Sequence, residues 1–183
     1  MKKDRIKDLR EDIPSAKYNK KLRCFQYADG SYTDIYRIVS KDIVNGGSDE
    51  IEIDCFKWAL FYKTYGNDVE LVAMRFPCDL SKQKKYWRQL LEKNENPSFD
   101  PMIQRKLAEL EYRERNTLKK EFFVLFFWET EADIKDGRLG IEKTMGVRHS
   151  GEAAGGMELL EEIPEKKKRQ IFFKFANKNS SIF

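Results

Sequence analysis

Apolar residues recur at helical spacing in several stretches of the chain, most clearly in residues 49–65. An Asn-Gly-Gly interruption at 45–47 precedes this stretch, Ser48 can cap it, and Asp49 and Glu50 suit the positive end of a helix dipole. Its apolar positions are Ile51, Cys55, Phe56, Trp58, Ala59, Leu60, Phe61, Tyr62 and Tyr65. Because these positions form a broad face, we expect a helix that the rest of the protein largely covers.

The same spacing predicts two further helices, joined by a polar loop. The first, residues 81–94, begins with Ser81 as a cap and carries aromatic and leucine side chains on one side. The second begins at Asp100-Pro101, where proline suits the first helical turn, and runs to about residue 119. Its inward side chains are expected to be Ile103, Leu107, Leu110 and Leu118.

Runs of β-branched and aromatic residues predict the strands. Residues 22–39 form a predicted hairpin about Asp29-Gly30, because this dipeptide readily supplies the positive φ of a tight turn. Residues 68–76 are expected to be a central strand that Pro77 ends. The aromatic run at 122–128 predicts a strand buried on both faces near the centre of the sheet.

The two ends of the chain and one internal segment carry weaker patterns. Residues 1–20 are mostly charged and predict a mobile leader. Residues 131–156 are rich in glycine and charge, which predicts a long exposed loop with at most one helical stretch. Residues 157–163 then predict a short helix stopped by Pro164, and alternating apolar residues in 169–177 predict a last strand.

These elements together predict an α/β (α+β) protein. We expect one mixed, mainly antiparallel sheet of about four or five strands covered by about three helices, because the sheet begins with a hairpin. At 183 residues the chain is long enough for one hydrophobic core. Residues 21–183 are therefore expected to form a single α/β domain.

Charge and cysteine content narrow the class of protein. The 35 Lys and Arg exceed the 31 Asp and Glu by 4 and are interspersed with them, which argues against a strong field for nucleic acid. No apolar run approaches the roughly 18 residues of a membrane-spanning helix. Cys24, Cys55 and Cys78 are odd in number and far apart, which predicts reduced core thiols in a cytoplasmic protein.

No motif in the sequence predicts catalysis, a cofactor or a metal. Residues 136–144 contain glycines and a Lys-Thr pair, but Glu142 occupies the position of the glycine that precedes the lysine in a phosphate loop. His149 is the one histidine and falls in the expected loop, a poor scaffold for a catalytic relay. The cysteines lack paired metal-ligand spacing. We therefore expect no enzyme activity, cofactor or metal site in this chain.

Two short basic clusters are candidates for contact with phosphates or anionic headgroups. They consist of Lys82, Lys84, Lys85 and Arg88, and of Lys166, Lys167, Lys168 and Arg169. Neither is interleaved with aromatic residues, as a platform for single strands would be. A small nucleic-acid-binding accessory protein of a mobile element is therefore kept as the alternative function, and steep salt dependence of binding would identify it.

Several short sequence segments are informative through their order along the chain, although none of them is a diagnostic motif by itself. They are DGSYTDIYRIVSKDI, NGGSDE, VELVAMRFPCD, NPSFDP and ELEYRERNTLKKEFFVLFFW, within about residues 22–130, and the ending IFFKFANKNSSIF. Their order and spacing resemble the N-terminal region of the conjugation ATPases of type IV secretion systems, especially those of Gram-positive mobile elements. The segment 133–156 departs from that pattern.

The resemblance implies an α/β docking module that helps attach the ATPase motor to the membrane components of a conjugation channel. In that family, nucleotide hydrolysis belongs to a separate C-terminal domain with phosphate-loop motifs. This chain carries no such motifs, so it is expected to be either a piece of a longer ATPase or a stand-alone relative. The implied partners are protein components of the channel at the inner face of the plasma membrane, with membrane contact only through them. Self-association into a homo-oligomer is a further expectation.

The expected contact surfaces are loops, because loops on a rigid sheet commonly carry recognition. They are the hairpin tip at Asp29 and Gly30 and the loop before Met157. The two basic clusters complete the set of candidate interaction residues.

Overall fold

The structure is a computed structural model that describes residues 16–152 and 155–176. The described residues group into two compact units, where the sequence predicts one domain. Residues up to 72 and from 122 onward form the first unit, and residues 73–121 form the second. Most of residues 1–20, the predicted leader, lies outside the described residues.

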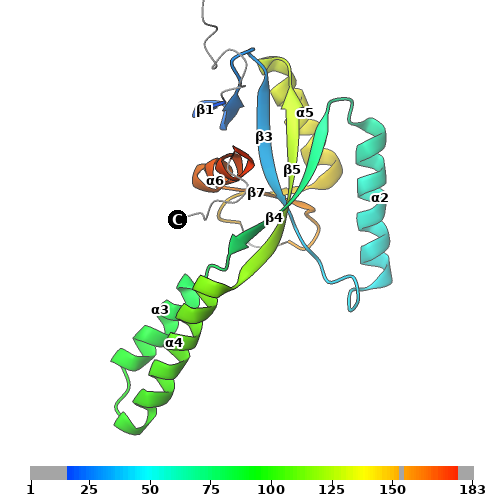
Figure 1. Cartoon of the computed structure of the whole chain (residues 1–183). Coiled ribbons are helices and arrows are strands. Elements are labelled where there is room, and N and C mark those ends of the chain that lie inside the picture. The colour runs from blue at the N-terminus through cyan, green and yellow to red at the C-terminus, as the bar shows by residue number, and fades with distance from the viewer. Residues whose placement is uncertain (1–15, 153–154, 177–183) are drawn as a thin grey trace, which may run out of the picture. The chain divides into compact units, whose positions relative to one another are not determined.

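The first unit is built on a mixed sheet (Figure 1). Within the described residues it has seven strands: β1 (Lys17–Asn19), β2 (Cys24–Gln26), β3 (Tyr32–Ile38), β4 (Val69–Pro77), β5 (Leu118–Trp128), β6 (Val147–Arg148) and β7 (Leu160–Glu162). The main strand order is β1-β2-β3-β5-β4. The pairs β1–β2, β2–β3, β3–β5 and β3–β7 are antiparallel, and β6–β7 is parallel. The predicted mixed, mainly antiparallel sheet is thus confirmed, with more strands than expected.

The strand β3 organises this sheet. One of its edges pairs with β5 along residues 32–37. Its other edge is shared: β2 pairs with residues 32 and 33, and β7 pairs with residues 36–38. Asp34 therefore lies between the residues of β3 that pair with β2 and those that pair with β7.

The hairpin that joins β2 to β3 turns at Asp29-Gly30, as predicted. Gly30 has a φ of 91°, a left-handed conformation that a residue with a Cβ adopts only with strain. Its N–H donates to the carbonyl of Tyr27, and the Asp29 carboxylate accepts from the backbone and the hydroxyl of Ser31. The turn is therefore held by its own hydrogen bonds.

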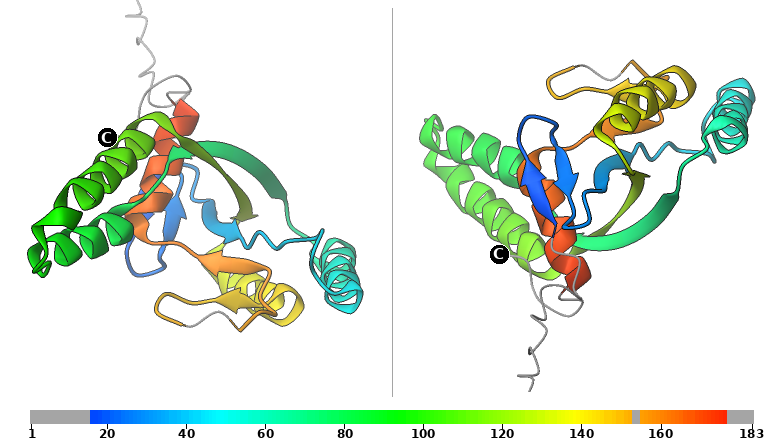
Figure 2. Two further views of the ribbon diagram at one scale, coloured as in Figure 1. Left: turned by 90° about the horizontal axis from the view of Figure 1, so that it is seen from below. Right: turned by 90° about the horizontal axis from the view of Figure 1, so that it is seen from above.

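The described residues contain five α-helices and one short 3₁₀ helix, η1 (Pro97–Phe99). The α-helices are α2 (Ser48–Thr64), α3 (Ser81–Glu92), α4 (Asp100–Asn116), α5 (Glu131–Met145) and α6 (Glu165–Ala176). Within the first unit, α5 and α6 lie on opposite faces of the sheet (Figure 2).

Each face of the sheet in the first unit has its own core. On the α5 face, Ile134, Ile141 and Met145 are buried with Phe126 of β5 and Phe61 of α2. On the α6 face, the rings of Phe25 and Phe172 lie with their centroids 4.1 Å apart. This two-sided burial explains the aromatic run of β5, in which residues 123–126 are all buried.

The helix α5 takes up Glu131–Met145, so most of the segment 131–156, for which a long exposed loop with one helical stretch was expected, is helical. Thr130 and Asp133 form a capping box, in which the Thr130 hydroxyl accepts from the Asp133 N–H at 3.3 Å and the Asp133 carboxylate accepts from the Thr130 N–H at 3.0 Å. Gly137 does not mark a loop; it lets the helix approach the sheet, since a Cβ there would lie 2.2 Å from the Trp128 indole nitrogen. The glycine content misled the prediction.

The two elements predicted after this segment are also wrong. Residues 157–163 contain the strand β7 instead of a helix, and most of 169–177 belongs to the helix α6 instead of a strand. Pro164 immediately precedes α6 rather than stopping a helix, and its carbonyl accepts from the N–H of Lys168 in the first turn of α6. Lys168, Ile171 and Phe172 follow the helical spacing that the local alternation of apolar residues concealed.

Three smaller expectations are corrected as well. β4 stands at the end of the main strand order and not at its centre. The helix α2 is correctly predicted, but Phe61 is its one buried residue, so it is not largely covered. The charged region 1–20 contains β1, so ordered structure begins earlier than Leu22.

The second unit contains a helical hairpin of α3, η1 and α4, together with residues 73–77 of β4 and 118–121 of β5. Ile103 and Leu110 are the buried residues of α4, and Leu118, which was expected to face inward, is exposed in β5. Ser81 does not cap α3; it is the first residue of that helix, and its N–H donates to the carboxylate of Asp79 at 3.0 Å. The hairpin is closed by local polar contacts as well as by apolar packing.

Candidate functional site

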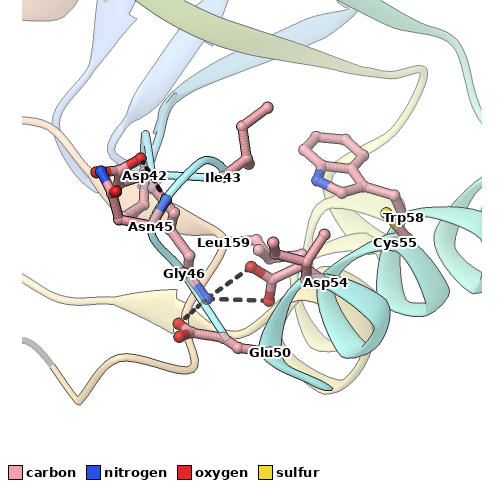
Figure 3. A pocket seen from close by; sticks show the side chains of 12 residues that line it. Asp42, Ile43, Asn45, Gly46, Glu50, Asp54, Cys55, Trp58 and Leu159 are labelled. Atoms are coloured by element: carbon pink, nitrogen blue, oxygen red, sulfur yellow. Dashed lines mark hydrogen bonds and ion pairs between the residues drawn. The ribbon is translucent and has the colours of Figure 1, made fainter. Parts of the chain in front are cut away.

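A cavity of about 550 Å³ opens at the N-terminal end of α2, within the first unit. Its wall consists of residues 39, 41–43, 45 and 46, which follow β3, residues 50, 51, 54, 55 and 58 of α2, and Leu159 just before β7. We call it the α2 pocket (Figure 3). The Val39 N–H donates to the Leu159 carbonyl at 2.9 Å, which fixes the first segment against the last.

Lys41 lines the α2 pocket and pairs with two carboxylates of α2, Glu50 and Asp54, both of which Figure 3 labels. Its ammonium lies 2.8 Å from Oδ2 of Asp54 and 3.3 Å from Oε1 of Glu50. Burial acts to lower the pKa of Lys41, but the hydrogen bonds and charges of Asp54 and Glu50 outweigh it and raise the pKa above its ordinary value. Lys41 is therefore a fixed cation and not a nucleophile.

The segment after Lys41 is a tight polar turn that presents apolar side chains to solvent. The Asp42 carboxylate accepts hydrogen bonds from the N–H groups of Val44 and Asn45 at 3.0 and 3.2 Å, and from the Asn45 side chain at 2.7 Å. These bonds lower the pKa of Asp42. Ile43 and Val44 project from the turn with exposed fractions of 72% and 86%.

Gly46 ends the turn at a point where the backbone passes very close to the carbonyl of Asp42. A Cβ at this position would lie 2.6 Å from the carbonyl oxygen of Asp42, a backbone atom that cannot move aside. The glycine is therefore needed for the loop to return to α2 over so short a distance.

The apolar part of the α2 pocket continues onto the exposed surface of α2. Trp58 lines the pocket and stacks on Tyr62, with ring centroids 5.8 Å apart. Phe56, which does not line the pocket, is 67% exposed on the same helix. Cys55 itself is an exposed free thiol.

The lining of the α2 pocket is acidic on balance. Asp42, Glu50 and Asp54 stand against the single ammonium of Lys41, a formal net charge of −2. Asp49 and Glu52, in the first turns of α2, are exposed acids outside this lining. The chain as a whole has a formal net charge of +4, so the pocket opposes the overall charge.

The hairpin tip and the basic cluster of α3 are at the surface. Asp29 is exposed and Gly30 half-buried at the tip. Lys82 and Lys85 on α3 are exposed, whereas Lys84 pairs with Glu114 and Arg88 lies 3.7 Å from Glu111, both on α4. Half of the α3 cluster is thus engaged within the hairpin of the second unit.

The basic cluster of α6 is divided by its helix. Lys168 is buried and donates hydrogen bonds to Asp34 and to the Arg23 carbonyl. Arg169 pairs with Glu165 at 2.8 Å, and the ammonium of Lys167 lies 5.8 Å from the centre of the Phe123 ring. Lys166 is exposed and Lys167 is half-buried. The cluster does not form one continuous basic surface, because Lys168 faces the protein interior.

His149 lies between two carboxylates of the first unit. Its ring nitrogens are each 3.5 Å from an acid, Nε2 from Glu142 and Nδ1 from Glu162. In the part of the chain that the structure describes, no group of three His, Cys, Asp or Glu side chains is arranged to hold a metal ion. Nor, in the same part, is any helix long and apolar enough to cross a membrane.

The sequence analysis missed the α2 pocket, although one signal pointed to it. Residues 40–47 are polar and turn-forming except for the adjacent pair Ile43 and Val44. Two large aliphatic side chains in a loop of that composition indicate either a buried anchor or an exposed contact. The pairing of Lys41 with Asp54 links the loop to the helix, and sequence spacing does not predict such a contact.

Comparison with protein-family models, with curated proteins and with solved structures finds no match for this chain.

Proposed function

We propose that this chain is a docking module, acting through protein contacts, of a conjugative type IV secretion ATPase or a stand-alone relative of one. In this proposal it works in the cytoplasm at the membrane face, and the α2 pocket with its apolar rim is the contact surface. The order of the sequence strings supports the assignment to a conjugation ATPase. The exposed apolar side chains around the pocket support docking through protein contacts.

The exposure of Ile43, which lines the α2 pocket, and of its neighbour Val44 carries the proposal. Leaving large aliphatic side chains in water forgoes about 1.5–3 kcal/mol each relative to full burial. Their turn is fixed by the Asp42 hydrogen bonds, so they do not collapse into the pocket beside them. An apolar group held outward next to an apolar cavity is typical of a contact surface.

A capture experiment tests this function. The full chain is immobilised and offered the solubilised membrane proteins of the conjugation channel of its own mobile element. We expect a channel component to be retained, and a double variant, Ile43→Asp with Val44→Asp, to reduce its retention by about tenfold or more. Leu139→Asp, which changes an exposed leucine on α5, is the matched control and should retain it fully.

Equal retention by both variants, or no retained channel component, would overturn the proposal. DNA-binding measurements on the same protein cover the alternative function. Tight binding to DNA that weakens steeply as salt rises would favour a nucleic-acid-binding accessory protein instead. The burial of Lys168 and the pairing of Lys84 leave fewer cations for such binding than the sequence suggested.

A further inference from the structure

We infer that the occupant of the α2 pocket is a linear segment of a partner protein in which a large apolar residue is flanked by arginine or lysine. The inference rests on the proposed docking function and specifies the chemistry of the partner. It follows from the size of the cavity, its charge and the way in which Glu50 is exposed.

The size of the α2 pocket limits how much of a partner can enter it. A volume of about 550 Å³ lies within the roughly 300–1,000 Å³ typical of small-ligand pockets. It accommodates one or two large side chains and not a folded element. Val39, Trp58 and Leu159 supply apolar wall, so the inserted side chains are apolar.

The charge of the α2 pocket indicates which residues flank the inserted apolar residue in the partner. Its lining has a formal net charge of −2. Complementary charge steers and aligns a partner without needing to be buried. A phosphate-bearing ligand is repelled by the same groups, which separates this surface from the basic clusters of α3 and α6.

Glu50 offers the partner a specific anchor. Its side chain is 55% exposed while it pairs with Lys41, whereas that of Asp54 is 18% exposed. A partner guanidinium can therefore bind Glu50 from the solvent side while Asp54 continues to hold Lys41. A basic residue of the partner next to the inserted apolar group is the match for this arrangement.

Cys55 provides a direct test in the unmodified full chain, because it is an exposed thiol in the pocket wall. The rate of its alkylation is measured by mass spectrometry with and without a short peptide that carries a central Trp-Leu pair between arginines. We expect saturating peptide to slow Cys55 alkylation by several-fold. Cys78, in the second unit, is alkylated in the same molecules and should keep its rate.

Two matched peptides and one variant separate charge from apolar contact. A peptide with glutamates in place of the arginines, and one with alanines in place of the Trp-Leu pair, should leave the Cys55 rate unchanged. Glu50→Gln should weaken the protection by the basic peptide, and added salt should do the same. Equal protection by all three peptides, or protection by the acidic one, would overturn the inference.

A second copy of the chain is the competing occupant. If Cys55 alkylation slows as the protein concentration rises without any peptide, the pocket mediates self-association and the inferred partner is wrong. The inference and the proposed function fail separately. Loss of channel capture in the Ile43 and Val44 variant without peptide protection contradicts the partner chemistry alone, whereas protection with unchanged capture contradicts the docking function alone.

Discussion

Lys168 of α6 and Asp34 of β3 form an ion pair closed to solvent, the side chain of each being 2% exposed. The ammonium also donates to the Arg23 carbonyl at 3.0 Å, and Arg138 of α5 donates to the second carboxylate oxygen of Asp34 at 2.6 Å. The helices α5 and α6, which supply these two basic side chains, lie on opposite faces of the sheet (Figure 2). One carboxylate thus ties both helix layers to the central strand.

Replacing Asp34→Asn should lower the free energy of unfolding by about 3 kcal/mol, because it leaves the buried Lys168 ammonium without its anionic partner. Chemical denaturation followed by circular dichroism measures this loss. Lys168→Met should cost less, since Asp34 keeps Arg138 and an uncharged chain of similar length fills the space. Asp29→Asn, at the exposed hairpin tip, is the control. A larger loss in Lys168→Met than in Asp34→Asn would contradict this account.

Two glycines of α5 should respond oppositely to alanine. Gly137→Ala should lower the free energy of unfolding by about 1–3 kcal/mol, because its Cβ would meet the indole of Trp128, which the core holds in place. Gly140→Ala meets no atom within 4 Å and should raise the free energy of unfolding by up to about 1 kcal/mol through helix propensity. Thermal unfolding of the two variants measures the difference, and equal effects would place the Trp128 contact in doubt.

Glu161 of β7 should make the stability of the protein depend on pH in the acid range. Burial acts to raise the pKa of Glu161, but the hydrogen bonds and charges of Arg37 and Arg148 outweigh it and lower the pKa below its ordinary 4.5. Because the folded state then binds this proton less readily than the unfolded state, the stabilisation is complete above about pH 4.5 and is lost as the pH falls through the lowered pKa.

Glu161→Gln should therefore lower the free energy of unfolding by about 1 kcal/mol at pH 7, a value reduced by the partial exposure of the group. At acid pH the variant and the original chain should unfold alike. Denaturation curves at both pH values provide the comparison. Glu165→Gln, which removes an exposed pair with Arg169 on α6, should change little at either pH.

The thiols of the first unit should differ in reactivity. Burial, reinforced by the nearby Asp34 charge, raises the pKa of the Cys24 thiol to about 11, and its side chain is inaccessible in the core. Cys55 is exposed and should be alkylated within the folded state. Timed alkylation near pH 8 should modify Cys55 first and leave Cys24 intact until denaturant is added; early modification of Cys24 would contradict its burial.

The sequence predicted the elements whose signals are local. The Asp29-Gly30 turn, the helix α2 and the buried strand β5 follow from turn chemistry, from spacing and from a continuous aromatic run. The sequence misled where one residue type serves two purposes. Gly137 looks like a loop residue, but it allows close packing against Trp128, and the Thr130 capping box was the signal that outweighed it.

The α2 pocket could not be derived in the same way. The contact of Lys41 with Asp54 depends on where the segment after β3 meets α2, and the hydrogen bond from Val39 to Leu159 joins residues far apart in the chain. Likewise, Lys168 is one of four consecutive basic residues in the sequence, and only its position on α6 shows which of them faces Asp34. Both the contact of Lys41 with Asp54 and that of Lys168 with Asp34 depend on side-chain directions that the sequence alone does not show.

The shared edge of β3 sets an order of events for folding. Arg37 and Glu161, which pair across that edge, are 124 residues apart, so their contact closes a very long loop. Such closure is slow compared with the formation of the α3–α4 hairpin, whose contacts are local. Until residues 160–162 arrive, residues 36–38 expose an unpaired strand edge, and nascent or nicked chains that lack β7 offer it to other molecules. Aggregation during synthesis should therefore depend on how soon that last strand is available.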